Sequence, residues 1–285
     1  MRTSLALGLV LAALVLPASA RGLGSASVAA LQVGLRAHGF YAGAIDGLAG
    51  PQTRRAIQKL QRRARITVDG LPGPRTRRAL GRFAKHRLGS RVLRSGRIGW
   101  DVAALQFELA LHGFPSGEFD GVFGPRTANA LHRFQRWAGL RSDGLAGPMT
   151  LRALARPAPA PTLQLAWPVQ TPALGDLFGP RGTRFHSGVD FVAPAGTPVY
   201  AAGAGRVVYA NWADGGYGFL VVVAHARGER TWYAHLSRID VRVGVWIGKG
   251  VRVGAVGATG DATGPHLHFE VRVRGAAVDP LRALP

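Results

Sequence analysis

The chain has 285 residues, a length that accommodates two or three domains of ordinary size. Hydrophobic residues make up 47% of it and charged residues 18%, which excludes a largely disordered chain. Cysteine is absent, so disulfide frameworks, cysteine nucleophiles and thiolate metal sites are excluded. The formal net charge is +21, and the segment 21–100 alone holds 17 basic residues against 2 acidic ones. This surplus indicates an anionic partner, although a genome that favours arginine codons would produce the same bias.

The first twenty residues have the pattern of a secretion signal. A basic start at Arg2 precedes an apolar run over residues 5–16, and Ala-Ser-Ala at 18–20 fits a small-x-small cleavage site. The apolar run is too short to span a bilayer. We therefore expect a signal peptide over residues 1–20 and a mature protein that is secreted to the cell wall or periplasm, with no stable membrane insertion. Export argues against nucleic acid as the partner and favours an anionic cell wall.

A duplication dominates the next part of the sequence. Residues 31–80 recur as residues 105–154, without a gap and with about half of the positions identical. Within each copy, Asp-Gly followed by Gly-Pro-x-Thr occurs twice. The apolar residues keep helical spacing, and a proline is tolerated in the first turn of a helix because its missing N–H has no partner there. The pattern predicts two copies of a small three-helix domain, with helices beginning at Pro51, Pro74, Pro125 and Pro148.

Both copies resemble the peptidoglycan-binding-like domain, a three-helix module common in bacterial wall enzymes. Leu-Gln, Gly-Phe, Asp-Gly, Gly-Pro-x-Thr and Phe-Gln motifs carry the resemblance over residues 25–84 and 92–155. It implies binding to peptidoglycan but identifies no ligand residues. We interpret the histidines of the Gly-Phe motifs as structural, and Trp100 and Trp137 as packing residues, although either indole could stack on a sugar.

The pattern changes after the second copy. Alanine and proline alternate up to Pro161, which is typical of a semi-rigid extended spacer that separates the two halves, and we place a linker at 156–165. Short runs rich in Val, Tyr and Gly then replace the helical pattern, so we expect an all-β domain over 166–285. The expected strands are 198–201, 205–210, 218–224, 232–236, 251–257 and 266–273.

Histidines cluster at three places in this β-rich half. His186 and Asp190 are four residues apart and His266 and His268 two apart, and either spacing puts both side chains on one face of a strand. His235 forms the third cluster. Two histidines and one aspartate satisfy the three protein ligands of a hydrolytic zinc site, with a position left open for water. The remaining histidines would handle protons, since the pKa of an unperturbed imidazole is about 6.5.

The same half resembles the lysostaphin/LytM-type zinc metalloendopeptidases, which cut peptidoglycan peptides and share a duplicated hybrid motif. The resemblance extends from about residue 167 to residue 284 without a major gap. Its motifs are Phe-Gly-Pro-Arg at 178–181, His-x-x-x-Asp at 186–190, Tyr-Ala-His-Leu-Ser at 233–237 and Thr-Gly-Pro-His-Leu-His-Phe-Glu at 263–270.

The resemblance implies a role for five residues. His186, Asp190 and His268 would bind one Zn²⁺ per chain, and His235 and His266 would orient water and stabilise the tetrahedral intermediate. All five are present, whereas degenerate members of the family lack ligands and act as activators of other wall enzymes.

Four other features of this half receive weaker interpretations. Glu270 shares a strand face with His268 and could orient a ligand, but we expect a structural role for it. Arg181 is expected near the cleft and His225 in a structural turn, while Tyr217, between two glycines, could line the groove.

We therefore expect a multidomain chain: two small all-α three-helix peptidoglycan-binding-like domains, then an all-β duplicated-hybrid-motif peptidase domain. The expected function is that of an exported zinc metalloendopeptidase, a monomer that hydrolyses peptide bonds in peptidoglycan stem peptides or cross-bridges. Its binding domains would hold it on peptidoglycan, and its arginine surplus on anionic cell-wall polymers. Two alternatives stay open: a non-catalytic wall-binding protein or activator, and a non-haem iron oxygenase, which also uses two histidines and one carboxylate.

Overall fold

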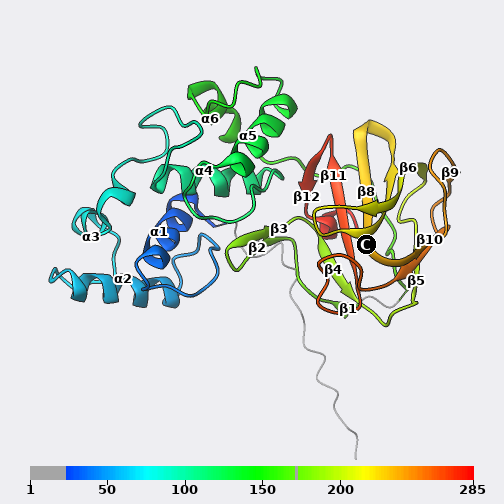
Figure 1. Cartoon of the computed structure of the whole chain (residues 1–285), viewed down its shortest axis with the longest axis horizontal. Helices are drawn as coiled ribbons and strands as arrows, with labels where there is room; N and C mark the ends of the chain where they lie inside the picture. The colour runs from blue at the N-terminus through cyan, green and yellow to red at the C-terminus, as the bar shows by residue number, and fades with distance from the viewer. Residues whose placement is uncertain (1–23, 171–172) are drawn as a thin grey trace, which may run out of the picture.

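The structure is a computed structural model that describes residues 24–170 and 173–285. The signal peptide expected at residues 1–20 lies outside the described residues. Six α-helices form the N-terminal half and twelve β-strands the C-terminal half (Figure 1), which confirms the expected order of helical domains and β-domain. None of the described helices combines the length and apolar character that a bilayer crossing needs.

The two repeats fold into equivalent sets of helices. Each expected proline occupies the first turn of its helix, so that its missing N–H leaves no hydrogen bond unmade. The first repeat contains α1 (Ala26–Ala37), α2 (Pro51–Arg63), α3 (Pro74–Ala79) and the short turn η2 (Gly81–Ala84), and the second contains α4 (Trp100–Leu111), α5 (Pro125–Trp137) and α6 (Pro148–Leu154).

A buried glutamine explains the fourfold Asp-Gly and Gly-Pro-x-Thr echo. Gln61 Nε2 lies 2.7 Å from Asp69 Oδ1 and 2.9 Å from Thr76 Oγ1. Its Oε1 accepts the Gly70 N–H at 2.9 Å. The polar groups of the loop before each proline-initiated helix thus form their hydrogen bonds with a single buried glutamine side chain. The equivalent contacts recur at Gln32, Gln106 and Gln135.

The repeats pack against each other through α1 and α4. Ala29 and Ala30 of α1 and Ala103 of α4 are completely buried in one hydrophobic cluster, and small side chains let the two helices approach closely. The opposite face of α4, with Val102 and Leu105, belongs to the core of the second repeat. α4 is therefore apolar on both faces, and the duplication forms one continuous helical body.

The C-terminal half is built on an antiparallel sheet. Its path is β1 (Ala173–Leu174), β4 (Val189–Val192), β11 (His266–Val273), β8 (Glu229–Ile239), β7 (Gly218–Ala224), β6 (Gly205–Ala213) and β9 (Trp246–Ile247). Off this path, β10 (Arg252–Val256) pairs with β8 and with β5 (Pro198–Tyr200), and β12 (Ala276–Val278) pairs with β11. A separate hairpin joins β2 (Gly179–Arg181) and β3 (Arg184–His186), and the short turns η3 (Ala226–Gly228) and η4 (Pro280–Arg282) complete the fold.

The alanine-proline segment does not keep the two halves apart. Gly113, which follows α4, accepts the Ala277 N–H from β12 at 3.1 Å, and Ala276 is buried in the core of the second repeat. The end of the linker is fixed as well, because the Thr162 N–H donates to the buried Glu229 carboxylate at 2.8 Å. The composition of the linker indicates its stiffness but does not indicate whether the flanking surfaces contact each other.

A matched pair of glycines tests this docking. Gly39 and Gly113 are equivalent and have φ values of 75° and 84°, but a Cβ would meet nothing within 4 Å at Gly39 and would lie 2.2 Å from the Ala277 carbonyl oxygen at Gly113. Gly39→Ala should cost about 1–2 kcal/mol of backbone strain. Gly113→Ala should cost about 1–3 kcal/mol more, because it also forces the repeat away from β12. Chemical denaturation measures both, and equal costs would mean that the halves do not dock here.

Candidate metal centre and catalytic groove

A groove of about 850 Å³ lies on the β-domain between β4, β11, the hairpin β2–β3 and the loop before β7. The groove is lined by the four histidines and the one aspartate to which the resemblance assigns roles. These residues lie on four different strands, β3, β4, β8 and β11. The five are His186, Asp190, His235, His266 and His268.

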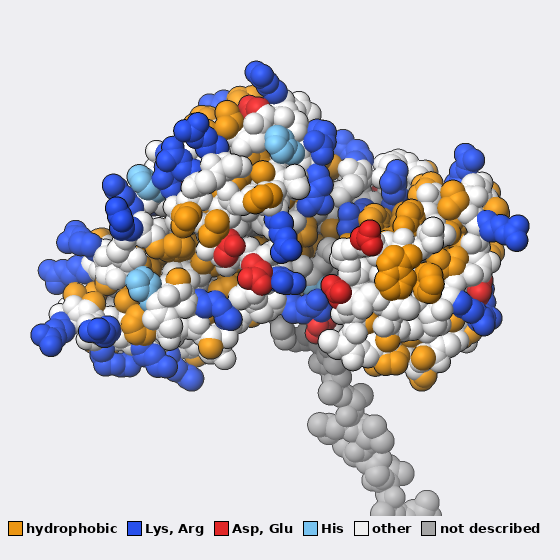
Figure 2. Space-filling model, in the orientation of Figure 1, with side chains coloured by type: hydrophobic (Ala, Val, Ile, Leu, Met, Phe, Trp, Pro, Cys, Tyr) orange, Lys and Arg blue, Asp and Glu red, His pale blue; other side chains and the backbone are white. Residues whose placement is uncertain are grey.

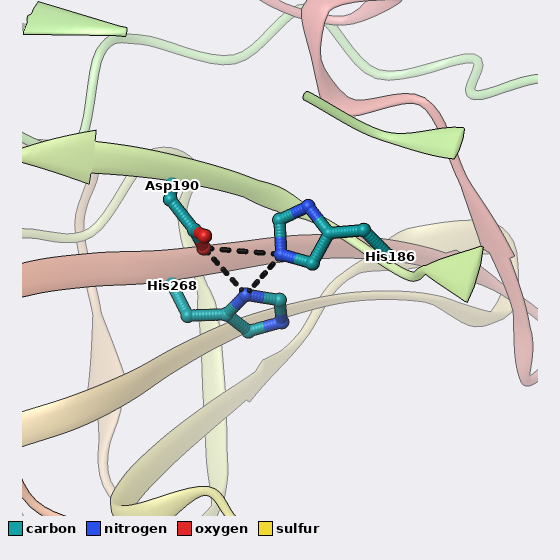
Figure 3. A group of neighbouring side chains, drawn as sticks. All are labelled: His186, Asp190 and His268. Atoms are coloured by element: carbon teal, nitrogen blue, oxygen red, sulfur yellow. Dashed lines mark hydrogen bonds and ion pairs between the residues drawn. The ribbon is translucent and has the colours of Figure 1, made fainter. Parts of the chain in front are cut away.

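Three of these side chains meet in one place (Figure 3). Asp190 and His268 are directly opposed on β4 and β11, and His186 approaches from the end of β3. His268 Nδ1 lies 2.8 Å from Asp190 Oδ1 and 3.0 Å from His186 Nε2. The third edge, from His186 Nε2 to Asp190 Oδ1, is 3.1 Å. Ligand atoms about 2.1 Å from a tetrahedral zinc lie about 3.4 Å apart, so this triangle is only slightly smaller than zinc requires.

The outer nitrogen of each histidine has its own acceptor. The Nδ1–H of His186 donates to the Leu177 carbonyl oxygen at 3.0 Å, and the Nε2–H of His268 donates to Glu270 Oε1 at 3.1 Å. These bonds place the ring protons on the outer nitrogens, so the inner nitrogens present lone pairs beside the Asp190 carboxylate. Three lone-pair atoms in contact need a cation among them, and two imidazoles with one carboxylate suit zinc.

The electrostatics of these residues favour a positive charge at the same point. Burial opposes the charged form of His268, but hydrogen bonds with Asp190 and Glu270 raise its pKa to about 9. Burial of Asp190 is likewise outweighed by its hydrogen bonds with His186 and His268, which hold the pKa of the carboxyl well below its usual range. Asp190 is therefore a carboxylate at any physiological pH.

His186 and Asp190 converge by a different route from the one their spacing suggested. They do not share a strand, because β3 ends at His186 and β4 begins at Val189. The chain turns between them at Gly188, where a Cβ would lie 2.4 Å from the Phe269 carbonyl oxygen of β11. Only glycine fits that approach. His266 and His268, in contrast, do share a face of one strand, as their spacing predicts.

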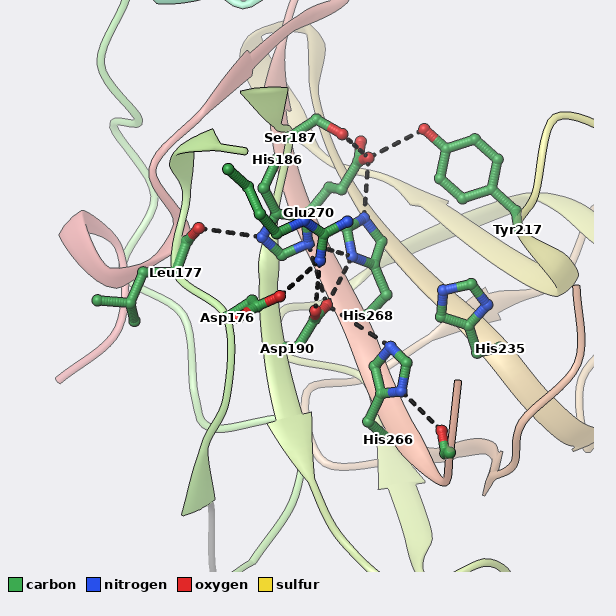
Figure 4. A network of polar contacts seen from close by, with 12 residues as sticks. Asp176, Leu177, His186, Ser187, Asp190, Tyr217, His235, His266, His268 and Glu270 are labelled. Carbon is green, nitrogen blue, oxygen red and sulfur yellow. Dashed lines mark hydrogen bonds and ion pairs between the residues drawn. The ribbon is translucent and has the colours of Figure 1, made fainter. Parts of the chain in front are cut away.

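His235 and His266 stand together beside the three residues (Figure 4), with ring centroids 4.8 Å apart. The Nδ1–H of His235 donates to the Thr259 carbonyl oxygen at 2.7 Å, and that of His266 to the Gly264 carbonyl oxygen at 2.8 Å. Each Nε2 is thereby left as an acceptor. Burial, and then the neighbouring histidines, lower the pKa of His235 to about 4, so it is neutral at pH 7.

The backbone is irregular at His235. Its φ is 59°, in the left-handed region that a residue with a Cβ seldom adopts. The pairings of β8 with β7 and with β10 both shift register beside this residue. Such irregularities redirect a side chain out of the regular alternation and concentrate at functional sites.

Behind His268 lies the buried carboxylate of Glu270. It has no exposed surface, and its Oε1 accepts Ser187 Oγ–H at 2.6 Å and Tyr217 O–H at 3.0 Å. Burial alone would raise its pKa, but the Arg272 guanidinium, 2.6 Å away, holds the pKa far below the usual range. Glu270 is thus a fixed anion placed to orient the His268 ring. The period-two alternation of 266, 268 and 270 indicated this role, but the sequence analysis favoured a structural one.

Two further charged residues lie at the mouth of the groove. Arg181 Nη1 is 2.7 Å from Asp176 Oδ2 and 3.5 Å from Asp190 Oδ2. Arg181 is thus at the cleft, as expected, whereas nothing in the sequence singled out Asp176. His225 does not line the groove, and bonds the Ala204 carbonyl oxygen and the Thr231 hydroxyl.

The helical repeats hold the hairpin that supplies His186. Ile45 of the first repeat and Phe119 of the second each donate a backbone N–H to a carbonyl oxygen of the hairpin turn at 182–183, at 2.8 and 2.7 Å. Phe185, only 8% exposed, is buried in the hydrophobic cluster of α1 and α4. The hairpin pairs with no strand of the main sheet, so these contacts fix the position of His186.

Shortening Phe185 tests this dependence. Phe185→Ala should weaken zinc binding about tenfold without touching a ligand atom, because His186 loses its anchor. Phe83→Ala, in the same cluster but outside the hairpin, should lower stability and leave zinc affinity unchanged. Competition with a chromophoric chelator measures both affinities. An unchanged affinity in Phe185→Ala would contradict the anchoring role.

Removing the charge of Glu270 tests its action on His268. Glu270→Gln should weaken zinc binding about 10–100-fold, the usual effect of losing a group that orients a ligand histidine. Glu229, equally buried on the adjacent strand β8 but bonded to Thr162, provides the control Glu229→Gln. Chelator competition should show a loss for Glu270→Gln alone, and equal losses would make the effect one of general stability.

Comparison with known proteins places these features in families. Residues 184–280 match peptidase family M23, and residues 24–80 and 99–154 match the putative peptidoglycan binding domain. Over 103 residues the chain is 47% identical to the DD-carboxypeptidase/endopeptidase Mpg of Neisseria meningitidis serogroup B, covering 36% of this chain and 24% of that protein. Over 99 residues it is 46% identical to the peptidoglycan DD-endopeptidase ShyA of Vibrio cholerae, covering 34% and 23%.

Among solved structures, the catalytic domain of lysostaphin from Staphylococcus simulans is similar at 38% identity, with 39% of this chain and 90% of that one covered and a TM-score of 0.37. The chain spans about a quarter of the length of the curated relatives named above.

Proposed function

We propose that this chain, which carries a peptidase family M23 domain and two putative peptidoglycan binding domains, is an exported zinc metalloendopeptidase of the bacterial wall. It hydrolyses peptide bonds in peptidoglycan stem peptides or cross-bridges and holds one Zn²⁺ per chain. The observation that carries the proposal is the triangle of His186, Asp190 and His268 in a groove shared with two more histidines. The relatives named as endopeptidases support a peptide substrate.

His186 Nε2, Asp190 Oδ1 and His268 Nδ1 would hold the zinc ion, which when bound would supply Lewis acidity for the scissile carbonyl and for a water. Proton transfer falls to the two other histidines. With their Nδ1 protons bound to backbone carbonyls, His235 and His266 accept through Nε2. They take the proton of the attacking water and return it to the leaving amine.

The helical repeats place the peptidase on its substrate. Lys and Arg side chains cover much of the helical half, while Asp and Glu are sparse there (Figure 2). Electrostatic retention on an anionic wall follows from this distribution and weakens as salt rises. Because the repeats also contact the hairpin of His186, the wall-binding repeats lie directly beside the candidate catalytic groove.

Mass spectrometry of the fragments released from purified peptidoglycan tests the proposed activity. The mature, zinc-loaded protein should release peptides with new amino and carboxyl termini, which identify the bond that is cut. His235→Ala and chelator-treated protein should release at least 100-fold less, because each lacks one part of the proton-transfer or Lewis-acid machinery.

The control experiment measures how much of each protein is retained on intact wall. Binding of His235→Ala to intact wall should equal that of the wild type, since the variant leaves the repeats unchanged. A folded, zinc-loaded protein that binds peptidoglycan and releases no fragments would contradict the enzymatic proposal and favour a binding protein or activator.

A further inference from the structure

The two helical repeats have a cavity at the same place, between the second helix and the loop that follows the first helix. In the second repeat it has a volume of about 910 Å³ and includes Arg126, Asn129 and Arg133 of α5. In the first repeat it has a volume of about 310 Å³, and the equivalent positions of α2 are Gln52, Arg55 and Lys59. A cavity that recurs at equivalent residues belongs to the fold of the repeat. We call the larger one the α5 groove.

The α5 groove is basic and its charges are unpaired. Arg126, Arg133, Arg136 and His132 line it, and no Asp or Glu does. None of the three arginines forms an ion pair within the described part of the chain. A concave site with three guanidinium groups and no carboxylate in its lining attracts an anion.

Arg133 carries the strongest electrostatic argument. Its side chain is half-buried, lies over the Phe114 ring at 5.9 Å and donates one hydrogen bond to the Pro115 carbonyl oxygen at 3.0 Å. Burial lowers its pKa, and the positive charges of Arg272 and Arg136 lower it further. A partly desolvated cation beside other cations is unfavourable until an anion compensates it.

A buried polar atom in the same groove also lacks a partner. Ser116 is 5% exposed, lines the groove, and its Oγ has no hydrogen-bond partner among the described residues. Buried hydroxyls are almost always hydrogen-bonded. Because the atom is itself enclosed, a ligand oxygen in the groove would satisfy it only after a rotation of the Ser116 side chain.

The α5 groove lies near the peptidase centre. The charges of Arg272 and Glu270 reach Arg133, and Arg272 Nη2 donates to the Tyr217 hydroxyl at 3.1 Å. Tyr217 lines the catalytic groove. Arg272 therefore connects Arg133 of the α5 groove with Tyr217 of the catalytic groove.

We propose that the α5 groove is a subsite that binds a carboxylate-bearing segment of the peptidoglycan peptide and presents the attached chain to the catalytic groove. The proposal rests on the proposed function for the identity of its ligand. Planar carboxylates match the arginine fork in two parallel hydrogen bonds. Phosphate groups of wall polymers share the oxyanion chemistry, and the experiment below distinguishes the two sources. The first repeat, with glutamine in place of Arg126, is expected to bind more weakly.

Calorimetric titration with a soluble disaccharide-tetrapeptide tests the proposal. The titrated protein is the full mature chain carrying His235→Ala, which prevents turnover of the ligand. Adding Arg126→Gln or Arg133→Gln should raise Kd about tenfold each, the ratio expected for one charge-assisted hydrogen bond. Arg152→Gln, an exposed cation of the same repeat outside the groove, should leave Kd unchanged. Converting the ligand carboxylates to amides should abolish the difference between the parent protein and the groove variants.

Three results would overturn the proposal: equal Kd for the parent and the groove variants, an equal loss in Arg152→Gln, or tighter groove-dependent binding of a glycerol-phosphate polymer than of the muropeptide. Arg133→Lys is the control for misfolding. It keeps the positive charge, so it should give an intermediate Kd and an unchanged melting temperature. Because binding is measured without turnover, the outcome is independent of whether the wild type releases fragments from peptidoglycan.

Discussion

The C-terminal β-domain is arranged around the contact among three atoms, His186 Nε2, Asp190 Oδ1 and His268 Nδ1. Bringing three lone-pair atoms within 3.1 Å of one another is unfavourable without a cation, so the surrounding structure must oppose their separation. The register of β4 and β11 fixes Asp190 opposite His268. The Leu177 carbonyl and the Glu270 carboxylate then fix the rotation of the two rings.

His186 depends on a different part of the chain from the other two residues. It ends a hairpin outside the main sheet, and the hairpin is fixed by backbone hydrogen bonds and an aromatic side chain inserted into the helical repeats. In Figure 1 this hairpin, β2–β3, lies between the helical half and the β-domain. The repeats therefore support the candidate metal centre and are also candidate wall-binding modules. A β-domain without them would lose the contacts that hold His186 in place.

Sequence periodicity predicted the features that depend on a single helix or strand, such as where an element begins and which residues share a face. The 266–273 run is β11 over the same residues, and each Gly-Pro pair begins a helix. The echo of Asp-Gly and Gly-Pro-x-Thr was visible, but its cause was not, because the glutamine that binds these loops lies on another helix. Periodicity reports which face a residue occupies and is silent on what packs against it.

The remaining features required contacts between distant segments. The turn at Gly188 forms because the Phe269 backbone passes close by. Glu270 becomes a positioning group only through Ser187, Tyr217 and Arg272. The linker composition did not reveal that Gly113 meets β12. None of these contacts leaves a local pattern in the sequence, so a resemblance could point to the site residues while their supports stayed hidden.

X-ray absorption spectroscopy on the purified mature chain, combined with metal analysis, tests the central claim most directly. We expect one zinc per chain, with two imidazole nitrogens and one carboxylate oxygen from the protein in its coordination shell. The spectrum of Phe185→Ala should show weaker imidazole scattering. Iron in place of zinc, a metal content far below one per chain, or a shell without two imidazoles would contradict it.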